Sequence, residues 1–209
     1  MHRVVDLKVL YFGTPVVLIG TRNPDGTANL APMSSAWWLG HQCMLGMNTV
    51  SQTTRNLVRE CECVLNLPSS ELVGAVDRLA LLTGSRTMSP RKIEQGYRYQ
   101  PDKFAAAGLT EQAADLVAAP RVAECPIQLE CELISAEPFG TENRATAHTV
   151  RVLRAHVQED LLVPGTAHVD SLGWDPLIMK FCEFFGGGEQ VHPSRLAEAW
   201  RIPQSVHGH

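Results

Sequence analysis

Hydroxyl and amide side chains gather directly ahead of a short amphipathic helix pattern that runs to about Glu60. Such a helix start presents unpaired backbone N–H groups and the positive end of the helix dipole, which together favour a phosphate. By itself such a cluster is more often only a helix cap, which Ser51, Thr53 or Thr54 can provide. The two interpretations are compatible. The members of the cluster are Asn48, Ser51, Gln52, Thr53, Thr54 and Asn56.

A run of small and weakly apolar residues precedes this cluster, and the bulky Trp37 and Trp38 follow the run. Its members are Ala31, Pro32, Met33, Ser34, Ser35 and Ala36. Proline forfeits a ladder hydrogen bond in a central strand, so we expect this strand to be open on one side. Together with the polar cluster, the open strand could hold a flat ring and an anion. In the alternative interpretation it is an edge strand whose serines face water.

The densest positive patch of the chain lies in a polar, breaker-rich loop over residues 83–92. It contains Arg86, Arg91 and Lys92. A local patch of this size suits one small anion. The ordinary alternative is a solvated loop, which we favour for Arg91 and Lys92.

Other active-site patterns are absent from the sequence. It has no glycine-rich dinucleotide motif, no Gly-x-Ser-x-Gly, no phosphate-binding loop and no His-Glu-x-x-His. His148 and His156 stand eight residues apart on an alternating pattern, so both could face one side of a strand. Zinc would need further ligands nearby, and we therefore predict no metal site.

The elements that must position these groups begin with a β-branched run over residues 15–22. The Asn-Pro-Asp-Gly sequence at 23–26 is typical of a hairpin turn into a second strand, 27–39, and a third apolar strand follows at 43–47. These three strands are predicted to form a meander. A short helix over 55–60 and a fourth strand over 63–67 come next.

A second helix is predicted to open at residues 69–71. Its core face has Leu72, Val73, Val76, Leu79 and Leu82 at helical spacing. Residues 93–120 indicate loops and short helices, including an alanine-rich piece ended by glycine at 108.

Two alternating strand patterns, 127–134 and 149–157, follow later in the chain and are joined by residues 138–143. We expect an antiparallel hairpin that closes a barrel with the earlier strands. The tail, 174–209, begins with an aromatic and apolar stretch that must be covered. Either its own barrel or a neighbouring subunit can cover it.

Composition narrows the class of protein. The 209 residues are 44% hydrophobic, which suits one domain over residues 1–209 with a proper core. The net charge of −4 offers no basic footprint for nucleic acid or an acidic membrane surface. Six cysteines without a C-x-x-C pair predict buried thiols in a reducing compartment. No long apolar run opens the chain, so we expect neither signal peptide nor membrane span, and a cytoplasmic location.

A dozen short matches in consistent order and spacing give the chain a resemblance to the flavin reductase-like family. They are residues 15–18, 25–26, 29–35, 48, 54–57, 62–68, 102–109, 119–120, 130–131, 156–157, 160–162 and 175–177. The likeness spans nearly the whole chain. It implies a mainly β fold with peripheral helices, the FMN-binding split β-barrel, and a homodimer with FMN at the subunit interface.

The resemblance also implies roles for individual residues. The isoalloxazine ring would lie against the backbone of Asn29 and of Ala31 to Ala36. The ribityl chain and phosphate would meet Asn48, Ser51, Gln52, Thr53, Thr54 and Asn56, with Ser85 and Arg86 closing over the phosphate through charge-assisted bonds. The flavin itself would carry the hydride chemistry, so the protein strictly needs no acid or base.

Two departures from the family pattern affect the expected activity. An inserted loop, 87–101, separates the Gly-Ser-Arg run from the Asp-Lys-Phe motif at 102–104, and this loop could cover the nicotinamide side. The histidine found early in the penultimate strand of many relatives would fall near Arg144 or Ala145, so we assign no catalytic residue.

Three functional hypotheses remain. The first is an NAD(P)H-dependent flavin reductase, with NADH or NADPH as co-substrate, that passes electrons to free flavin or a partner oxygenase. The second is an FMN-holding electron-transfer protein without efficient NAD(P)H turnover. The third is a split-barrel scaffold with a different pocket, such as a pyridoxal phosphate or haem relative.

Overall fold

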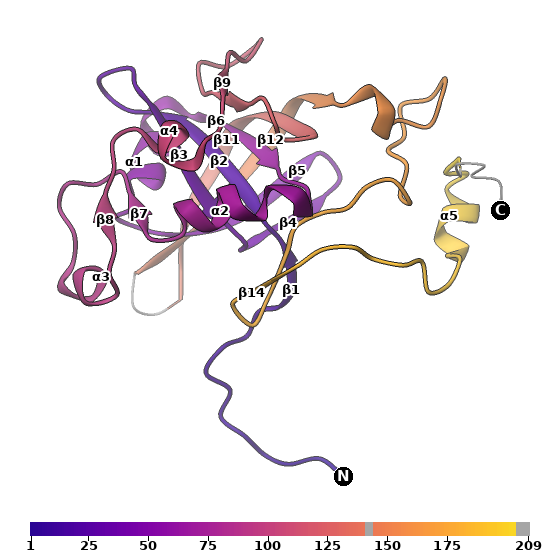
Figure 1. The fold of residues 1–209 in the computed structure, drawn as a ribbon, viewed down its shortest axis with the longest axis horizontal. Helices are drawn as coiled ribbons and strands as arrows, with labels where there is room; N and C mark the ends of the chain where they lie inside the picture. The colour runs from indigo at the N-terminus through magenta and orange to yellow at the C-terminus, as the bar shows by residue number, and fades with distance from the viewer. Residues whose placement is uncertain (141–143, 204–209) are drawn as a thin grey trace.

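A seven-stranded antiparallel sheet forms the centre of the molecule in the computed structural model, which describes residues 1–140 and 144–203 (Figure 1). Its strand order is β3-β2-β6-β11-β12-β5-β4. The strands are β2 (Val17–Arg22), β3 (Ala28–Met33), β4 (Ala36–Leu39), β5 (Gln42–Asn48), β6 (Glu62–Leu67), β11 (Ile127–Phe139) and β12 (Ala145–Val157).

The sheet curls because its two edges are almost adjacent in the chain. Edge strand β3 ends at Met33, and β4, at the opposite edge, begins at Ala36. Only Ser34 and Ser35 connect them, so the edges must approach each other although they do not pair as strands. The result is a split barrel. Pro32 lies on an edge strand, which confirms the expectation that this strand is open on one side.

The predicted meander of three consecutive strands is wrong. The expected strand over residues 27–39 is two strands, with β3 paired to β2 and β4 paired to β5. The physical reason is closure of the barrel, which places the two halves of that stretch on opposite edges of one sheet. Local alternation along the chain carries no information about this break.

Two apolar clusters lie on the two faces of β2. Val17 and Ile19 point into the barrel, where they pack with Leu45, Leu65 and other buried side chains. Val16 and Leu18 point outward and pack under two helices, α2 (Val73–Leu79) and α4 (Lys103–Ala107). This double burial explains the unbroken β-branched run in the sequence.

The cysteines only partly follow the expectation of buried thiols. Cys43, Cys63, Cys125 and Cys131 are buried, whereas Cys61 and Cys182 are exposed, and all six are free thiols. Cys61 is the C-cap of α1 (Gln52–Glu60) and adopts a left-handed backbone with φ of 57°. Its exposure therefore follows from its place at a helix end.

The second predicted helix is shorter than expected. A 3₁₀ turn (Ser70–Leu72) leads into α2, which ends at Leu79. Leu82 instead opens β7 (Leu82–Thr83), which pairs in parallel with β8 (Arg98–Tyr99). Helix α3 (Pro90–Glu94) lies between these two strands, and α4 follows them and ends at Gly108, as expected. A further small pair, β9 (Glu111–Gln112) and β10 (Arg121–Val122), precedes β11.

The predicted hairpin of β11 and β12 is confirmed, and both strands are longer than the sequence pattern suggested. Residues 141–143 of its connection lie outside the described part of the chain. The register shifts where Glu130 faces Arg154 and Cys131 faces Val152, which leaves one extra residue in β12. This bulge places His148 and His156 on opposite faces of the sheet, contrary to the alternation expected from their spacing.

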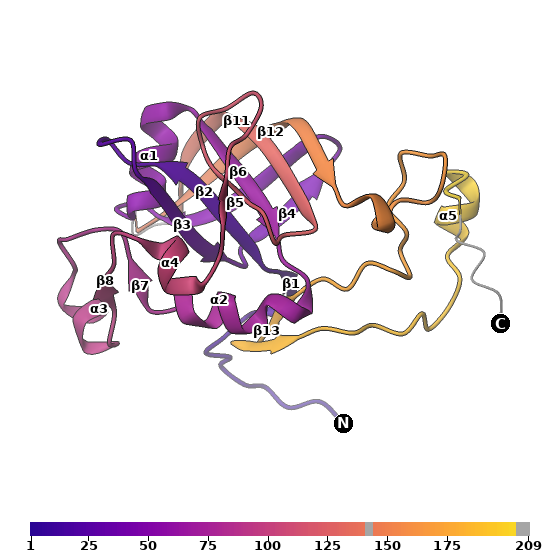
Figure 2. The ribbon, with the colours of Figure 1, turned by 45° about the horizontal axis from the view of Figure 1, so that its top comes forward.

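The first part of the tail packs on its own barrel, and the last part extends away from it. After a 3₁₀ turn (Glu159–Leu161), strands β13 (Ile178–Lys180) and β14 (Glu183–Phe185) form a small sheet with β1 (Phe12–Pro15). Leu177 is fully buried there. Beyond β14 the chain runs away from the barrel to α5 (Arg195–Ala199) (Figure 2). In residues 1–140 and 144–203, no helix is long and apolar enough to span a membrane.

Candidate functional site

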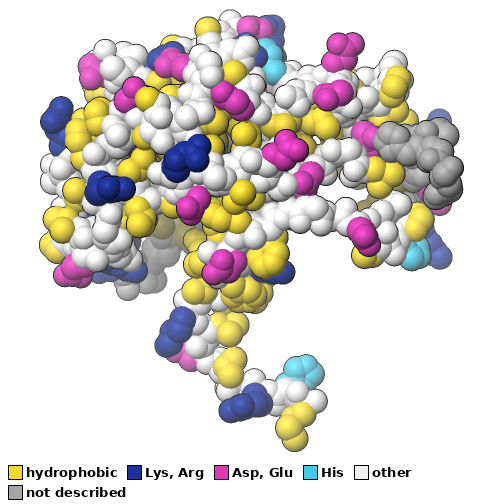
Figure 3. Space-filling model, in the orientation of Figure 1, with side chains coloured by type: hydrophobic (Ala, Val, Ile, Leu, Met, Phe, Trp, Pro, Cys, Tyr) yellow, Lys and Arg dark blue, Asp and Glu magenta, His cyan; other side chains and the backbone are white. Residues whose placement is uncertain are grey.

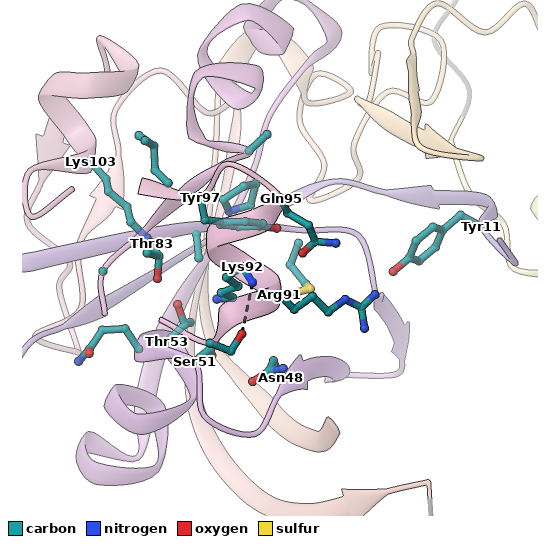
Figure 4. A pocket seen from close by; sticks show the side chains of 18 residues that line it. Tyr11, Asn48, Ser51, Thr53, Thr83, Arg91, Lys92, Gln95, Tyr97 and Lys103 are labelled. Carbon is teal, nitrogen blue, oxygen red and sulfur yellow. Dashed lines mark hydrogen bonds between the residues drawn. The ribbon is translucent and has the colours of Figure 1, made fainter. Parts of the chain in front are cut away.

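Two adjoining hollows follow strand β3 and the start of α1. The larger one, the main pocket, has a volume of about 540 Å³, and the smaller one, the outer hollow, about 330 Å³. Gln52 and Gly84 line both, so the two form one continuous groove. Polar and charged residues of the main pocket include Asn48, Ser51, Gln52, Thr53, Thr83, Arg91, Lys92, Gln95 and Lys103 (Figure 4).

The small-residue strand divides among several surfaces. Ala31, Pro32 and Met33 line the main pocket, and Ser34 lies in a shallow neighbouring hollow. Ser35 and Ala36 line a third, more apolar hollow of about 640 Å³ beside Trp37. Tyr11, Met33 and Asn48 line both the main pocket and this apolar hollow. The predicted ring platform therefore runs along the split of the barrel and faces more than one cavity.

Helix α1 begins at the wall of the main pocket. Ser51 is its N-cap, because its side chain accepts a hydrogen bond of 3.0 Å from the backbone N–H of Thr54. The Ser51 hydroxyl in turn donates to the Thr54 hydroxyl, which donates to the carbonyl of Asn48 at 2.9 Å. The cap interpretation is thus confirmed for Ser51. Ser51, Gln52 and Thr53 also line the main pocket, which leaves the phosphate interpretation open.

Three of the predicted contact residues, Asn29, Thr54 and Asn56, are buried and line none of these hollows. Asn29 donates to the hydroxyls of Thr21 and Thr53 at 3.0 and 3.1 Å. Asn56 donates to Thr21 at 3.1 Å and accepts from Gln52 at 2.9 Å. This network ties α1 to strands β2 and β3. It orients Gln52 and Thr53 toward the groove, so its members act on the groove through their neighbours.

Lys103 is the residue that sequence reasoning missed. Its side chain is only 3% exposed, and its ammonium group donates to the Asn29 side-chain oxygen at 3.2 Å and to the Leu30 carbonyl at 2.8 Å. Burial, with a smaller contribution from Lys92, lowers the pKa of Lys103 to about 8. Its third proton has no partner in the described residues. The available signal was its place directly after Asp102, the N-cap of α4.

Positive charge dominates the groove. Arg91, Lys92 and Lys103 line the main pocket, and the described residues that line it include no aspartate or glutamate. The outer hollow is lined by Arg55, Arg86 and Ser85, with Asp25 as its acid. Arg86 lies over the Tyr99 ring at 4.7 Å and Lys92 over the Tyr97 ring at 5.1 Å. Arg91 is exposed and Lys92 is half-buried, and both line the main pocket, so they can be solvated charges or contacts for an anion bound there.

The loop that carries Ser85 and Arg86 lies close against the network through Gly84. A Cβ atom at this position would lie 2.6 Å from the Asn29 side-chain oxygen and 3.2 Å from Gln52. Only glycine permits this approach, which brings the loop within reach of the start of α1. The close contact joins the main pocket to the outer hollow.

The two histidines of interest lie outside the groove. His148 is fully buried inside the barrel, and this burial lowers its pKa. Neither of its ring nitrogens has a hydrogen-bond partner among the described residues. His156 lies 2.5 Å from Glu130, which also accepts the backbone N–H groups of Asp115 and Leu116. Ligand atoms of Asp115, Glu130 and His156 lie within 4.8 Å of one another. The bonds that Glu130 already makes give it a structural role.

Comparison with known proteins identifies one family. A model of the flavin reductase like domain matches residues 9–182. The uncharacterised protein YdfE of Bacillus subtilis (strain 168) is 36% identical over 184 residues, which make up 88% of each chain.

Solved structures share the fold at lower identity. Flavoredoxin of Desulfovibrio vulgaris (Miyazaki F) matches with a TM-score of 0.76 and 23% identity over 95% of this chain and 100% of its own. Component B of nitrilotriacetate monooxygenase from Bacillus cereus has a TM-score of 0.72 and 22% identity over 87% and 88%. A flavin reductase from Shewanella frigidimarina, described as having a split barrel domain, has a TM-score of 0.69 and 16% identity over 87% and 86%. The predicted fold class, mainly β with a split barrel, is confirmed.

Proposed function

Because the chain belongs to the flavin reductase-like family, whose members use a flavin as cofactor or substrate, we propose that it binds FMN and reduces it with NADH or NADPH. The observation that carries the proposal is the groove, in which a half-buried strand of small residues adjoins a helix start and five cationic side chains. The main-pocket volume of about 540 Å³ suits a small-molecule site.

The groove has a suitable place for each part of FMN. The ring would lie along Ala31, Pro32 and Met33, where small or flexible side chains leave the backbone accessible. The phosphate would lie at the outer hollow, where Arg55, Arg86 and the start of α1 supply positive charge and N–H donors. Gln52 and Gly84 lie between the two ends, as a ribityl chain requires.

Bound FMN would supply the hydride chemistry, and the protein would supply position and charge. Lys103 holds a buried positive charge directly beneath β3, next to the carbonyl of Leu30. A cation there favours negative charge in the pocket, which accumulates when a flavin accepts a hydride. No protein acid or base is needed for that step.

The second candidate function is an FMN-holding electron-transfer protein without efficient NAD(P)H turnover. One observation favours it, since none of the described residues lining the main pocket is a histidine. The physiological electron acceptor of a flavin reductase would be free flavin or a partner oxygenase. That of an electron-transfer protein would be another protein. Structural relatives bear the names of both kinds, a flavoredoxin and a monooxygenase component.

An absorption spectrum of the purified protein with added FMN, followed by anaerobic NADH and NADPH, tests the proposal. Perturbed flavin bands and rapid bleaching by either nucleotide are the expected result. Flavin binding with bleaching only by dithionite or a protein donor would favour the electron carrier. A colourless protein that leaves the spectrum of added FMN unchanged would remove both, and would leave the scaffold hypothesis.

We also propose that the protein is a homodimer. The apolar hollow beside Trp37 adjoins the ring end of the main pocket, and large exposed apolar side chains of Trp37, Leu39 and Phe139 lie on or near it. A second copy of the chain would cover these side chains and would close the ring end of the groove.

A further inference from the structure

The cations of the groove fall into two groups. Arg55 and Arg86 line the outer hollow, whereas Arg91, Lys92 and Lys103 line the main pocket. Gln52 and Gly84 lie where the two hollows meet. FMN carries a single phosphate, which can occupy one hollow only. If Arg55 and Arg86 bind that phosphate, the cations of the main pocket remain without a counter-charge.

Several basic residues of the barrel are neutralised by an acidic partner, whereas the five groove cations have none among the described residues. Arg22 pairs with Glu111, Arg151 with Glu132 and Arg154 with Asp115. Within residues 1–140 and 144–203, none of the five groove cations makes an ion pair with a carboxylate. Lys92 is half-buried, and its positive charge lowers the pKa of Lys103. Unneutralised cations held this close disfavour one another, and a bound anion would relieve that repulsion.

Arg91 and Lys92 are presented by a built element. Their helix, α3, is capped by Ser89, and the loop that contains it is closed at its base by the parallel pair β7–β8. Backbone bonds of 2.9 Å join Arg98 to Leu81 and Gln100 to Thr83 across that base. Figure 4 shows Arg91, Lys92 and Gln95 on one side of the pocket, with Ser51 and Thr53 on α1 nearby. The inserted loop thus adds a charged wall to the flavin groove.

We propose that Arg91 and Lys92 form a second anion subsite, which binds the phosphate groups of the pyridine dinucleotide that donates the hydride. This inference rests on the proposed function and extends it. A dinucleotide needs phosphate contacts beside the ring end of the flavin and away from the flavin phosphate. The α3 wall lies at the main pocket, which Ala31, Pro32 and Met33 also line. Arginine suits a phosphate because its planar fork can donate two parallel hydrogen bonds.

The test compares Arg91→Gln/Lys92→Gln with wild type. ADP-ribose, which has the dinucleotide phosphates but no nicotinamide, is titrated by calorimetry into the FMN-loaded protein and into the flavin-free protein. We expect its Kd to rise about tenfold or more in the double variant, because two charge-assisted contacts are lost. The KM for NADH and NADPH should rise by a similar factor, while the FMN Kd and kcat stay within about twofold of wild type.

The matched control is Arg98→Gln. Arg98 lies on β8 in the same loop and carries the same charge, yet it lines neither the main pocket nor the outer hollow. The Arg98→Gln variant should bind ADP-ribose and FMN as tightly as wild type does. If Arg98→Gln weakens ADP-ribose as much as the double variant does, the effect is one of net charge and the subsite is refuted.

Other outcomes overturn the proposal in distinguishable ways. If wild type binds no ADP-ribose, or if the double variant binds it equally well, α3 has no dinucleotide subsite. A loss of FMN affinity equal to that of ADP-ribose would assign Arg91 and Lys92 to the flavin phosphate. A loss of affinity for FAD alone would assign Arg91 and Lys92 to the second phosphate of FAD. Failure of the protein to bind FMN would refute the proposed function, and the titration of the flavin-free protein would still decide the subsite.

Discussion

Among single residues, Lys103 links the fold of the groove to its charge. Its ammonium group bonds to Asn29 and to the Leu30 carbonyl, so it stabilises the edge strand and also makes the pocket floor positive. The pKa of Lys103 is lowered to about 8, from 10.5, chiefly by burial. The unfolded chain therefore binds more protons between these two values, and the ligand-free protein should gain stability as pH rises through that window.

Flavin affinity should show the opposite dependence. As pH rises through about 8, Lys103 loses its proton in the free protein and its attraction for the negative charge of reduced flavin in the main pocket weakens. We expect the Kd of reduced FMN to rise between pH 7 and pH 9, with proton uptake on binding detected by anaerobic calorimetry in buffers of different ionisation enthalpy. The phosphate itself stays doubly charged over roughly this range. Lys103→Met should bind reduced FMN more weakly at pH 7 and lose the pH dependence, and an unchanged profile in that variant would refute the assignment.

His148 gives a prediction about stability alone. The imidazole is fully buried in the barrel, and no described residue lies in hydrogen-bonding geometry to either ring nitrogen. Burial lowers its pKa from 6.5, and the nearby backbone of Leu45 and Thr146 offsets part of that shift. The unfolded chain therefore binds the extra proton as pH falls below 6.5, and the native state loses stability there. His148→Leu should be more stable by about 1 to 3 kcal/mol at neutral pH, because it removes unsatisfied buried polar atoms. Its unfolding free energy should also change less between pH 7.5 and 5.5 in urea titrations.

His156 provides the contrasting variant. It is paired with the buried Glu130, so His156→Leu removes a partner from that carboxylate and should destabilise the protein. If His148→Leu and His156→Leu change stability equally, the environment of each histidine does not decide its contribution to stability.

At the scale of elements, local chemistry predicted much of what the structure contains. The Ser51 cap, the edge position of Pro32, the hairpin of β11 and β12 and the glycine end of α4 each depend on neighbours in sequence. The break between β3 and β4 and the early end of α2 depend on barrel closure and on the pairing of β7 with β8. Those contacts join distant segments, and no local pattern encodes them.

The distinction between contacts of sequence neighbours and contacts of distant segments also applies to the candidate site. Ser51, Gln52 and Thr53 were recognised because they are adjacent in the chain, and they do line the main pocket. Lys103 was missed because its bonds to Asn29 and Leu30 span more than seventy residues. Arg91 and Lys92 were taken for solvated charges, since only the folded loop shows the pocket that they face. The assignment of individual residues to FMN stays a prediction.

Gly84 tests how the elements of the groove fit together. Gly84→Ala would place a Cβ atom 2.6 Å from the Asn29 side-chain oxygen, and the loop with Ser85 and Arg86 must then shift away from α1. We expect FMN affinity to fall about tenfold or more, through loss of a charge-assisted phosphate contact. The measurement is quenching of flavin fluorescence on titration with protein.

The control for this variant is Gly74→Ala, at an exposed position of α2. A Cβ there meets only the end of the Arg78 side chain at 3.5 Å, which is ordinary contact. This change should leave FMN affinity unaltered and raise stability by about 0.5 to 1 kcal/mol, because alanine favours the helix. If Gly84→Ala binds FMN as wild type does, the close approach is not needed for the site.

At the scale of the whole molecule, apolar surface remains uncovered on the described part of the chain. Apolar side chains gather on one face where β1 and β14 meet the barrel (Figure 3). Phe12 packs edge-on against Phe181 with ring centroids 5.3 Å apart, yet both remain largely exposed. Residues after β14 run away from the barrel to α5, where Leu196 and Trp200 are exposed (Figure 1). An arm of this kind suits contact with a second subunit.

The proposed homodimer gives the last prediction. Leu39 is 77% exposed and Trp37 is 56% exposed on edge strand β4, next to the apolar hollow that adjoins the main pocket. We expect wild type to sediment as a dimer, and Trp37→Asp/Leu39→Asp as a monomer, because buried carboxylates without partners oppose association. The monomer should bind FMN more weakly, since the ring end of its groove is open. Val58→Asp, on the exposed face of α1, is the control and should remain dimeric. A monomeric wild type with full FMN affinity would show that one chain completes the site.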